Sequence, residues 1–243
     1  NEIYPLHLKY TGKDSNSKLC EIRDELKLLG SEKDSNSYVF LLSKLDEIAW
    51  LTNLRGSDIE YNPVFEAYAA IFSDRAVCFC HLPESNLSQY CPDWEFRPYS
   101  EYQSYLKKLA SQEKLKVWLD PSSITMGTLM AFRESQVLEK VSPVILKKAV
   151  KNSSEINAAK NAHKMAGAGV VRSFSKLQNY FETGHPVTEK EYSDWLFEEY
   201  EKSEGFSDLS FNSIVGSGTN GAIVHYGTPD CENPIKAGEM ILV

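Results

Sequence analysis

The chain has 243 residues, of which 42% are hydrophobic and 25% are charged. These values are ordinary for a globular protein that buries a core in one large domain or two medium ones. Lys and Arg number 26 against 34 Asp and Glu, which gives a formal net charge of −8. No overall positive field would therefore attract nucleic acid. No apolar run approaches membrane-spanning length either, so we expect neither a nucleic-acid partner nor a membrane.

The first part of the chain alternates between helical and strand patterns. Leu19, Ile22, Leu26 and Leu29 recur at helical spacing before Gly30, and a polar loop is expected at 31–37. Further helices are expected at 46–54, about 99–109 and 122–132, and strands at 38–42, 76–82, 116–119 and 136–141. This alternation predicts an α/β layer domain with a mixed sheet.

The pattern changes near Pro143, and we place a domain boundary close to Lys147. Asn152 with Glu155 three residues later has the spacing of a capping box, which begins a long helix whose apolar stripe continues to Phe181. A second capping box, Thr188 with Glu191, begins another helix. Strands are then expected at 209–215, 222–226 and 239–243. An apolar strand at a free terminus is an aggregation liability, so we expect the second domain, 148–243, to continue beyond Val243.

The five cysteines are Cys20, Cys78, Cys80, Cys91 and Cys231. Their odd number and irregular spacing predict reduced thiols in a reducing compartment. Cys78 and Cys80 fall on one face of an expected strand, and no second cysteine or histidine pair has matching spacing. They are therefore interpreted as core residues rather than metal ligands.

Three glycines satisfy the spacing of the dinucleotide-binding fingerprint: Gly216, Gly218 and Gly221. That fingerprint requires a helix directly after the last glycine, with its N-terminus facing the pyrophosphate. The residues after Gly221 are β-branched and aromatic and predict a strand instead. A nucleotide site is therefore excluded, and the glycines are interpreted as a connection that needs positive φ angles or a close approach of the backbone.

His225 lies in the strand expected after these glycines, on the same face as Ile223. One interpretation is a histidine bonded to a backbone carbonyl. The other is a site histidine, since apolar neighbours would desolvate an imidazole that could donate to a developing oxyanion or shuttle a proton. Arg55, before Gly56, is a weaker candidate for substrate binding, and a structural bridge to Asp58 is the simpler interpretation.

Four segments resemble aminopeptidase P of the three-domain, cytosolic type, a family that removes an N-terminal residue preceding proline. They are LDEIAWLTNLRGSDIEYNPVF (Leu45–Phe65), KAVKNSSEINAAKNAH (Lys148–His163), DLSFNSIVGSGTNGAIVHY (Asp208–Tyr226) and AGEMILV (Ala237–Val243). The segments keep the order of the family, and the resemblance extends from about Tyr10 to the end of the chain.

The resemblance implies a creatinase-like middle domain at 1–147, followed at 148–243 by the incomplete first part of an α+β "pita-bread" catalytic domain. In the family, the histidine that corresponds to His225 lines the active site and assists the reaction. Thr219 stands where the family commonly has proline, which could loosen the glycine loop.

The resemblance also implies a dinuclear metal site, usually manganese, held by two aspartates, a histidine and two glutamates. All five would lie beyond Val243, so we expect no metal ligand and no activity in this piece alone. For the longer protein we expect peptides with proline at the second position as substrates, a cytoplasmic location and a homodimer. The alternative is a pita-bread protein without metals that serves as a binding or regulatory module.

Overall fold

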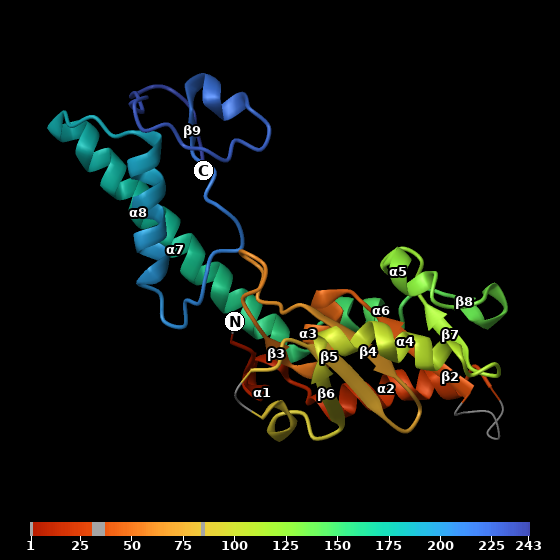
Figure 1. Cartoon of the computed structure of the whole chain (residues 1–243). Coiled ribbons are helices and arrows are strands. Elements are labelled where there is room, and N and C mark those ends of the chain that lie inside the picture. The colour runs from red at the N-terminus through yellow and green to blue at the C-terminus, as the bar shows by residue number, and fades with distance from the viewer. Residues whose placement is uncertain (1, 31–36, 84–85) are drawn as a thin grey trace. The chain divides into compact units, whose positions relative to one another are not determined.

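The computed structural model describes residues 2–30, 37–83 and 86–243. The expected loop at 31–37 therefore lies, except for Ser37, outside the described residues. The chain forms two compact units, Asn1–Ile156 and Asn157–Val243, drawn in red to green and in cyan to blue in Figure 1. The first unit ends further along the chain than Lys147 because residues after Lys147 still bond to it. Asn152 Nδ2 donates to the Thr11 carbonyl at 2.8 Å, and Trp50 Nε1 donates to Glu155 Oε1 at 3.4 Å.

The first unit is built on a six-stranded sheet with the order β6-β5-β4-β2-β7-β8. These strands are β6 (Trp94–Pro98), β5 (Ala76–Cys80), β4 (Ala67–Ile71), β2 (Tyr38–Leu42), β7 (Lys116–Leu119) and β8 (Val137–Glu139). The pairs β2–β4 and β4–β5 are antiparallel, and the other three pairs are parallel. The mixed sheet expected from the sequence is therefore confirmed. A separate antiparallel pair joins β1 (Tyr4–Pro5) to β3 (Leu54–Arg55).

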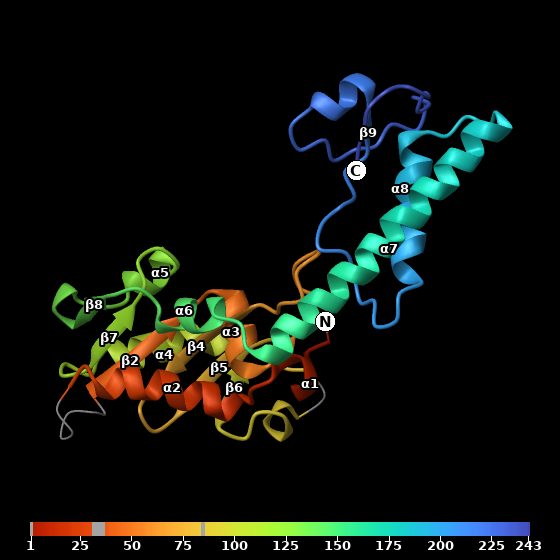
Figure 2. The same ribbon diagram turned by 180° about the vertical axis from the view of Figure 1, so that it is seen from behind.

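Helices cover both faces of this sheet (Figures 1 and 2). On one face lie α2 (Ser15–Lys27), α3 (Leu45–Thr52) and α6 (Pro143–Ala149), and on the other lies α4 (Tyr102–Ala110). The short elements are α1 (Leu8–Thr11), α5 (Met126–Leu129) and the 3₁₀ helices at Leu87–Gln89, Tyr99–Glu101 and Glu134–Gln136. Strand β2 shows the consequence of two covered faces, because Phe40 and Leu42 enter one core while Val39 and Leu41 enter the other.

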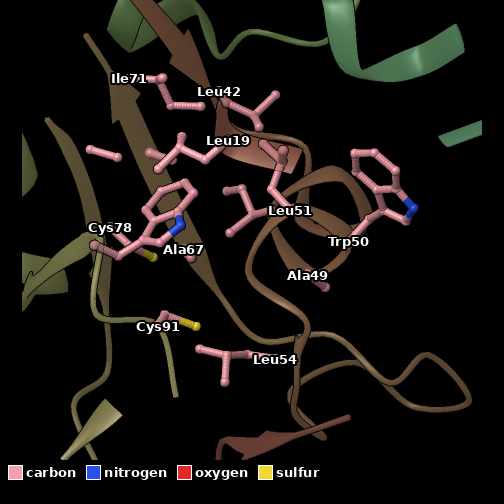
Figure 3. Packing of buried hydrophobic residues seen from close by; sticks show 14 of the residues in the cluster. Leu19, Leu42, Ala49, Trp50, Leu51, Leu54, Ala67, Ile71, Cys78 and Cys91 are labelled. Carbon is pink, nitrogen blue, oxygen red and sulfur yellow. The ribbon is translucent and has the colours of Figure 1, made fainter. Parts of the chain in front are cut away.

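Helix α2 shows how the sequence sets this packing. The side chain of Asp14 accepts a hydrogen bond from the Ser17 amide at 2.8 Å and caps the helix. Of the predicted apolar stripe, Leu19, Ile22 and Leu26 are fully buried, and Leu29 is partly buried. Figure 3 shows Leu19 beside Leu42 and Leu51. The helix ends at Lys27, before the predicted stop at Gly30.

The remaining predictions for the first unit concern two cysteines, two strands and one helix. Cys78 and Cys80 are fully buried, which confirms their interpretation as core residues. Strands β4 and β6 were not predicted. The expected helix at 122–132 is shortened to α5.

The second unit consists of two helices followed by a largely irregular segment. Helix α7 (Ser153–Thr183) begins at the predicted Asn152–Glu155 capping box, whose hydrogen bonds measure 2.9 and 3.1 Å. Helix α8 (Glu189–Glu201) begins at the predicted Thr188–Glu191 box. The small core of the second unit comprises Leu177, Val187, Tyr192, Val215 and Ile235. Three residues of the apolar stripe of α7, Ile156, His163 and Phe174, are exposed.

The end of this unit differs most from the predictions. Residues 209–215 form no strand, and the expected strand at 222–226 is replaced by the 3₁₀ helix η5 (Gly218–Ala222) and a turn. Strands β9 (Gly216–Ser217) and β10 (Ile241–Leu242) form a short antiparallel pair. Across the described part of the chain, no helix combines the length and the apolar character needed to cross a membrane.

A buried carboxyl in the first unit makes its stability depend on pH. Glu47 is 1% exposed, and its Oε2 accepts a hydrogen bond from Ser142 Oγ at 2.5 Å. Its Oε1 is buried without a hydrogen-bond partner and lies 3.8 Å from Lys44 Nζ. Burial raises the pKa of the Glu47 carboxyl above its ordinary value.

Glu47→Gln should therefore gain stability relative to the original protein as pH rises from about 4.3, the ordinary glutamate pKa, to 7. The folded state binds the Glu47 proton more tightly than the unfolded state, so ionisation across this range weakens folding in the original protein only. Urea unfolding at several pH values measures the difference, and the exposed Glu60→Gln is the control. A stability difference that is constant with pH would show that burial of Glu47 has no such cost.

Candidate functional site

The carboxylate of Glu189 is the centre of the polar structure in the second unit. Glu189 is the first residue of α8 and is 0% exposed. The capping box between Thr188 and Glu191 fixes this helix start: the Glu191 amide donates to Thr188 Oγ1 at 3.2 Å, and the Thr188 amide donates to Glu191 Oε2 at 2.8 Å. The side chain of Glu189 is thereby held at a defined position against the segment that follows β9.

Four groups, one from β9 and three from the segment after it, donate hydrogen bonds to the two oxygens of Glu189. The Ser217 amide donates to Oε1 at 2.7 Å, and Asn220 Nδ2 lies 3.1 Å from Oε1 and 3.3 Å from Oε2. The Tyr226 hydroxyl donates to Oε2 at 2.7 Å, and the Asp230 amide donates to the same oxygen at 3.0 Å. One buried side chain therefore organises residues 217 to 230.

These hydrogen bonds settle the ionisation states of the network. Burial alone would raise the pKa of the Glu189 carboxyl, but the donated hydrogen bonds outweigh burial and hold the pKa below its ordinary value. The hydrogen bond to Glu189 raises the pKa of Tyr226 to about 12. At neutral pH the pair therefore consists of an ionised carboxylate and a protonated phenol, which is a charge-assisted hydrogen bond.

The glycines of the loop allow a close approach of the backbone. A Cβ on Gly216 would lie 2.9 Å from the Gly221 amide nitrogen, and Gly218 has a φ of +55°. These are the two roles expected for glycines in a tight connection. The element directly after β9 is the short 3₁₀ helix η5, which ends at Ala222. Residues 221–243 therefore offer no α-helix N-terminus for a pyrophosphate, and the strand predicted at 222–226 is missing as well.

His225 is placed differently from the prediction. It lies in a turn with a left-handed φ of 56° and is exposed. Its neighbours Ile223 and Val224 are 50% and 81% exposed, so they do not desolvate it. The expected strand is absent because the chain turns at 223–226 and brings the Tyr226 hydroxyl back to Glu189. His225 therefore lies at the surface next to Tyr226, whose hydroxyl is hydrogen-bonded to Glu189.

Arg55 lies in the first unit, in β3. Its Nη1 donates to the Ala49 carbonyl at 2.7 Å and to the Leu54 carbonyl at 2.9 Å. Burial lowers the pKa of this guanidinium. These backbone contacts give Arg55 a structural task in holding the end of α3 against β3.

Two further features bear on ligand binding. In the part of the chain that the structure describes, no three His, Cys, Asp or Glu side chains come together in a group that could hold a metal ion. A largely apolar cavity of about 710 Å³ lies in the second unit between α7, α8 and residues 203–214. Neither His225 nor Glu189 lines this cavity, so it is separate from the polar network.

The sequence did not identify Glu189. Its two neighbours in the capping box were recognised, but an acidic residue in the first turn of a helix is ordinarily explained by the helix dipole. Thr188 and Glu191 are partly or fully exposed, whereas Glu189 is buried. What distinguishes Glu189 is its set of hydrogen bonds to residues 28 to 41 positions later in the chain, which no local pattern indicates.

Comparison with known proteins agrees with this architecture. The "Creatinase/Prolidase N-terminal domain" family matches residues 1–155, and "Metallopeptidase family M24" matches residues 157–243. The chain therefore belongs to the creatinase/prolidase family and continues into an M24 metallopeptidase domain. The resemblance to aminopeptidase P is confirmed by the relatives and structures that follow.

Among curated relatives, "Xaa-Pro aminopeptidase 1" of Dictyostelium discoideum is 37% identical over 255 residues, covering 100% of this chain and 38% of the relative. A "Probable Xaa-Pro aminopeptidase P" of Coprinopsis cinerea is 35% identical, covering 95% of this chain and 38% of the relative. The chain thus spans about two fifths of the length of these relatives.

A solved structure shares the fold. It is described as an X-prolyl aminopeptidase from Caenorhabditis elegans, "a cytosolic enzyme with a di-nuclear active site". The similarity has a TM-score of 0.86 at 23% identity and covers 99% of this chain and 40% of that one.

Proposed function

We propose that this chain is part of a longer, metal-dependent aminopeptidase that hydrolyses the N-terminal Xaa-Pro bond of peptides. The observation that carries the proposal is the similarity to Xaa-Pro aminopeptidases along the whole chain, together with the M24 match at 157–243. An Xaa-Pro bond is a tertiary amide without an N–H and with a fixed φ, so general peptidases fit it poorly. Cleavage of this bond therefore calls for a dedicated enzyme.

The two parts of the chain would have different tasks. The first unit, Asn1–Ile156, would form the creatinase-like middle domain, and the second, Asn157–Val243, would begin the catalytic domain. The described residues contain no group that fits a metal ion. We take the two divalent ions of the longer protein to be manganese, held by residues outside this chain. The longer protein would be a cytoplasmic homodimer.

Within this chain, His225 is the residue that we propose takes part in the reaction. An exposed imidazole can reach a bound peptide and donate a hydrogen bond to the oxygen of the scissile carbonyl as negative charge develops there. The bonded neighbour Tyr226 restricts where this imidazole can lie. Arg55, bonded to two backbone carbonyls, remains a lesser candidate for contact with the substrate.

The proposal is tested by purifying the longer protein and dialysing it against a chelator. With manganese restored, it should release the first residue from an Arg-Pro-Pro peptide, and without manganese it should release none. A protein that binds this peptide but leaves it intact with manganese present would contradict the enzyme and support the binding module instead. The 243-residue chain alone should show no activity and bind no stoichiometric manganese.

A further inference from the structure

We propose that Glu189 is a positioning residue of the active site, which fixes both ends of the segment that carries His225. The proposal concerns the reaction of the proposed function and rests on it for its catalytic part. Its structural part, the anchoring of the segment by one carboxylate, stands on the contacts alone.

The contacts enclose His225 from both sides in sequence. Ser217 and Asn220 precede it, Tyr226 and Asp230 follow it, and all four donate to the Glu189 carboxylate. Asn220 Nδ2 also donates to the Tyr226 hydroxyl at 3.1 Å. Residues 221–225 therefore form a short loop whose two ends are joined directly and through Glu189. Because its two ends are joined, this loop can adopt few backbone conformations, and the position of His225 is restricted accordingly.

The backbone of His225 shows why anchoring is needed. Its φ of 56° is left-handed, a conformation that residues other than glycine adopt at a cost in energy. His225 itself has exposed apolar neighbours and no burial to hold it there. The hydrogen bonds of the Tyr226 and Asn220 side chains, together with the one from the Ile223 amide to the Asn220 carbonyl at 3.1 Å, maintain this turn.

A carboxylate suits this task better than any neutral side chain. Glu189 is buried, and its two oxygens accept from four donors without donating in return. In Glu189→Gln, an amide NH₂ group, which can only donate hydrogen bonds, would replace one of these oxygens and point at groups that also donate. At least one donor would then lose its acceptor inside the protein. Glu189→Gln keeps the size of the side chain, so it removes anchoring with little change in packing.

The structural part is tested on the 243-residue chain by amide hydrogen exchange. The Ser217 and Asp230 amides should exchange on the order of tenfold faster or more in Glu189→Gln than in the original chain. Glu201→Gln, at the exposed end of the same helix, should leave both rates unchanged, and the amide of the buried Leu196 should be unaffected in either variant. Unchanged exchange at Ser217 and Asp230 in Glu189→Gln would overturn the proposal.

The catalytic part is tested in the longer protein with a double-mutant cycle. Glu189→Gln should lower kcat by about 10- to 100-fold, as expected for a misplaced group, with a much smaller change in KM. In a His225→Ala background the same substitution should have little further effect, because the histidine that it positions is gone. An equal loss in both backgrounds, or no loss while His225→Ala is impaired, would overturn the positioning role. If the original longer protein cleaves nothing, the proposed function fails, and hydrogen exchange still decides whether Glu189 anchors the loop.

Discussion

Leu19→Ala is expected to lower the free energy of unfolding of the first unit by about 2–5 kcal/mol. Leu19 is 0% exposed and belongs to the core formed by α2, α3 and the sheet; Figure 3 shows it beside Leu42 and Leu51. Removing its side chain would leave a cavity that the neighbouring residues cannot fill without moving. Urea unfolding followed by circular dichroism measures the loss.

The matched control is Leu28→Ala, one residue beyond the end of α2. Leu28 is 82% exposed, so the same substitution should change stability by no more than about 0.5 kcal/mol. Leucine and alanine have similar helix propensities, and the comparison therefore isolates burial. Equal losses in the two variants would show that α2 does not pack as described.

The second large effect is expected at His225. In the longer protein, His225→Ala should lower kcat by about 10²-fold or more, the typical contribution of a residue that transfers or donates a proton in the transition state. Because the side chain is exposed, the substitution should leave the unfolding temperature unchanged. Steady-state kinetics with an Arg-Pro-Pro peptide provide the measurement.

The control for this experiment is Val224→Ala, which alters the exposed neighbour in the same turn and should keep normal turnover. Near-normal turnover of His225→Ala would show that this histidine takes no part in the reaction. A parallel loss in Val224→Ala would instead indicate that the turn as a whole, and not the imidazole, is required.

Local patterns predicted the parts of the fold that local forces determine. The two capping boxes and the apolar stripe of α2 are encoded within a few residues, and the structure confirms them. Strand β4 was missed because its sequence, AYAAI, is rich in alanine and has little of the β-branched character that favours strands. Strand β6 was missed because it ends in proline.

The failed predictions concern structure that depends on distant residues. Residues 222–226 have the composition of a strand, but a strand needs a neighbour to pair with, and among the described residues β9 pairs with β10. The turn forms instead because Tyr226 bonds to Glu189, 37 residues earlier. The same distance explains why Glu189 was overlooked. The sequence identified His225 as a candidate and could not indicate what holds it.

The identity of the reaction is tested most directly by two peptides that differ only at the second residue. The longer protein, supplied with manganese, should release arginine from Arg-Pro-Pro and leave Arg-Ala-Pro intact, with product release followed by mass spectrometry. Release of arginine from both peptides at similar rates, or from neither, would contradict the assignment of this chain to an enzyme that cleaves Xaa-Pro bonds.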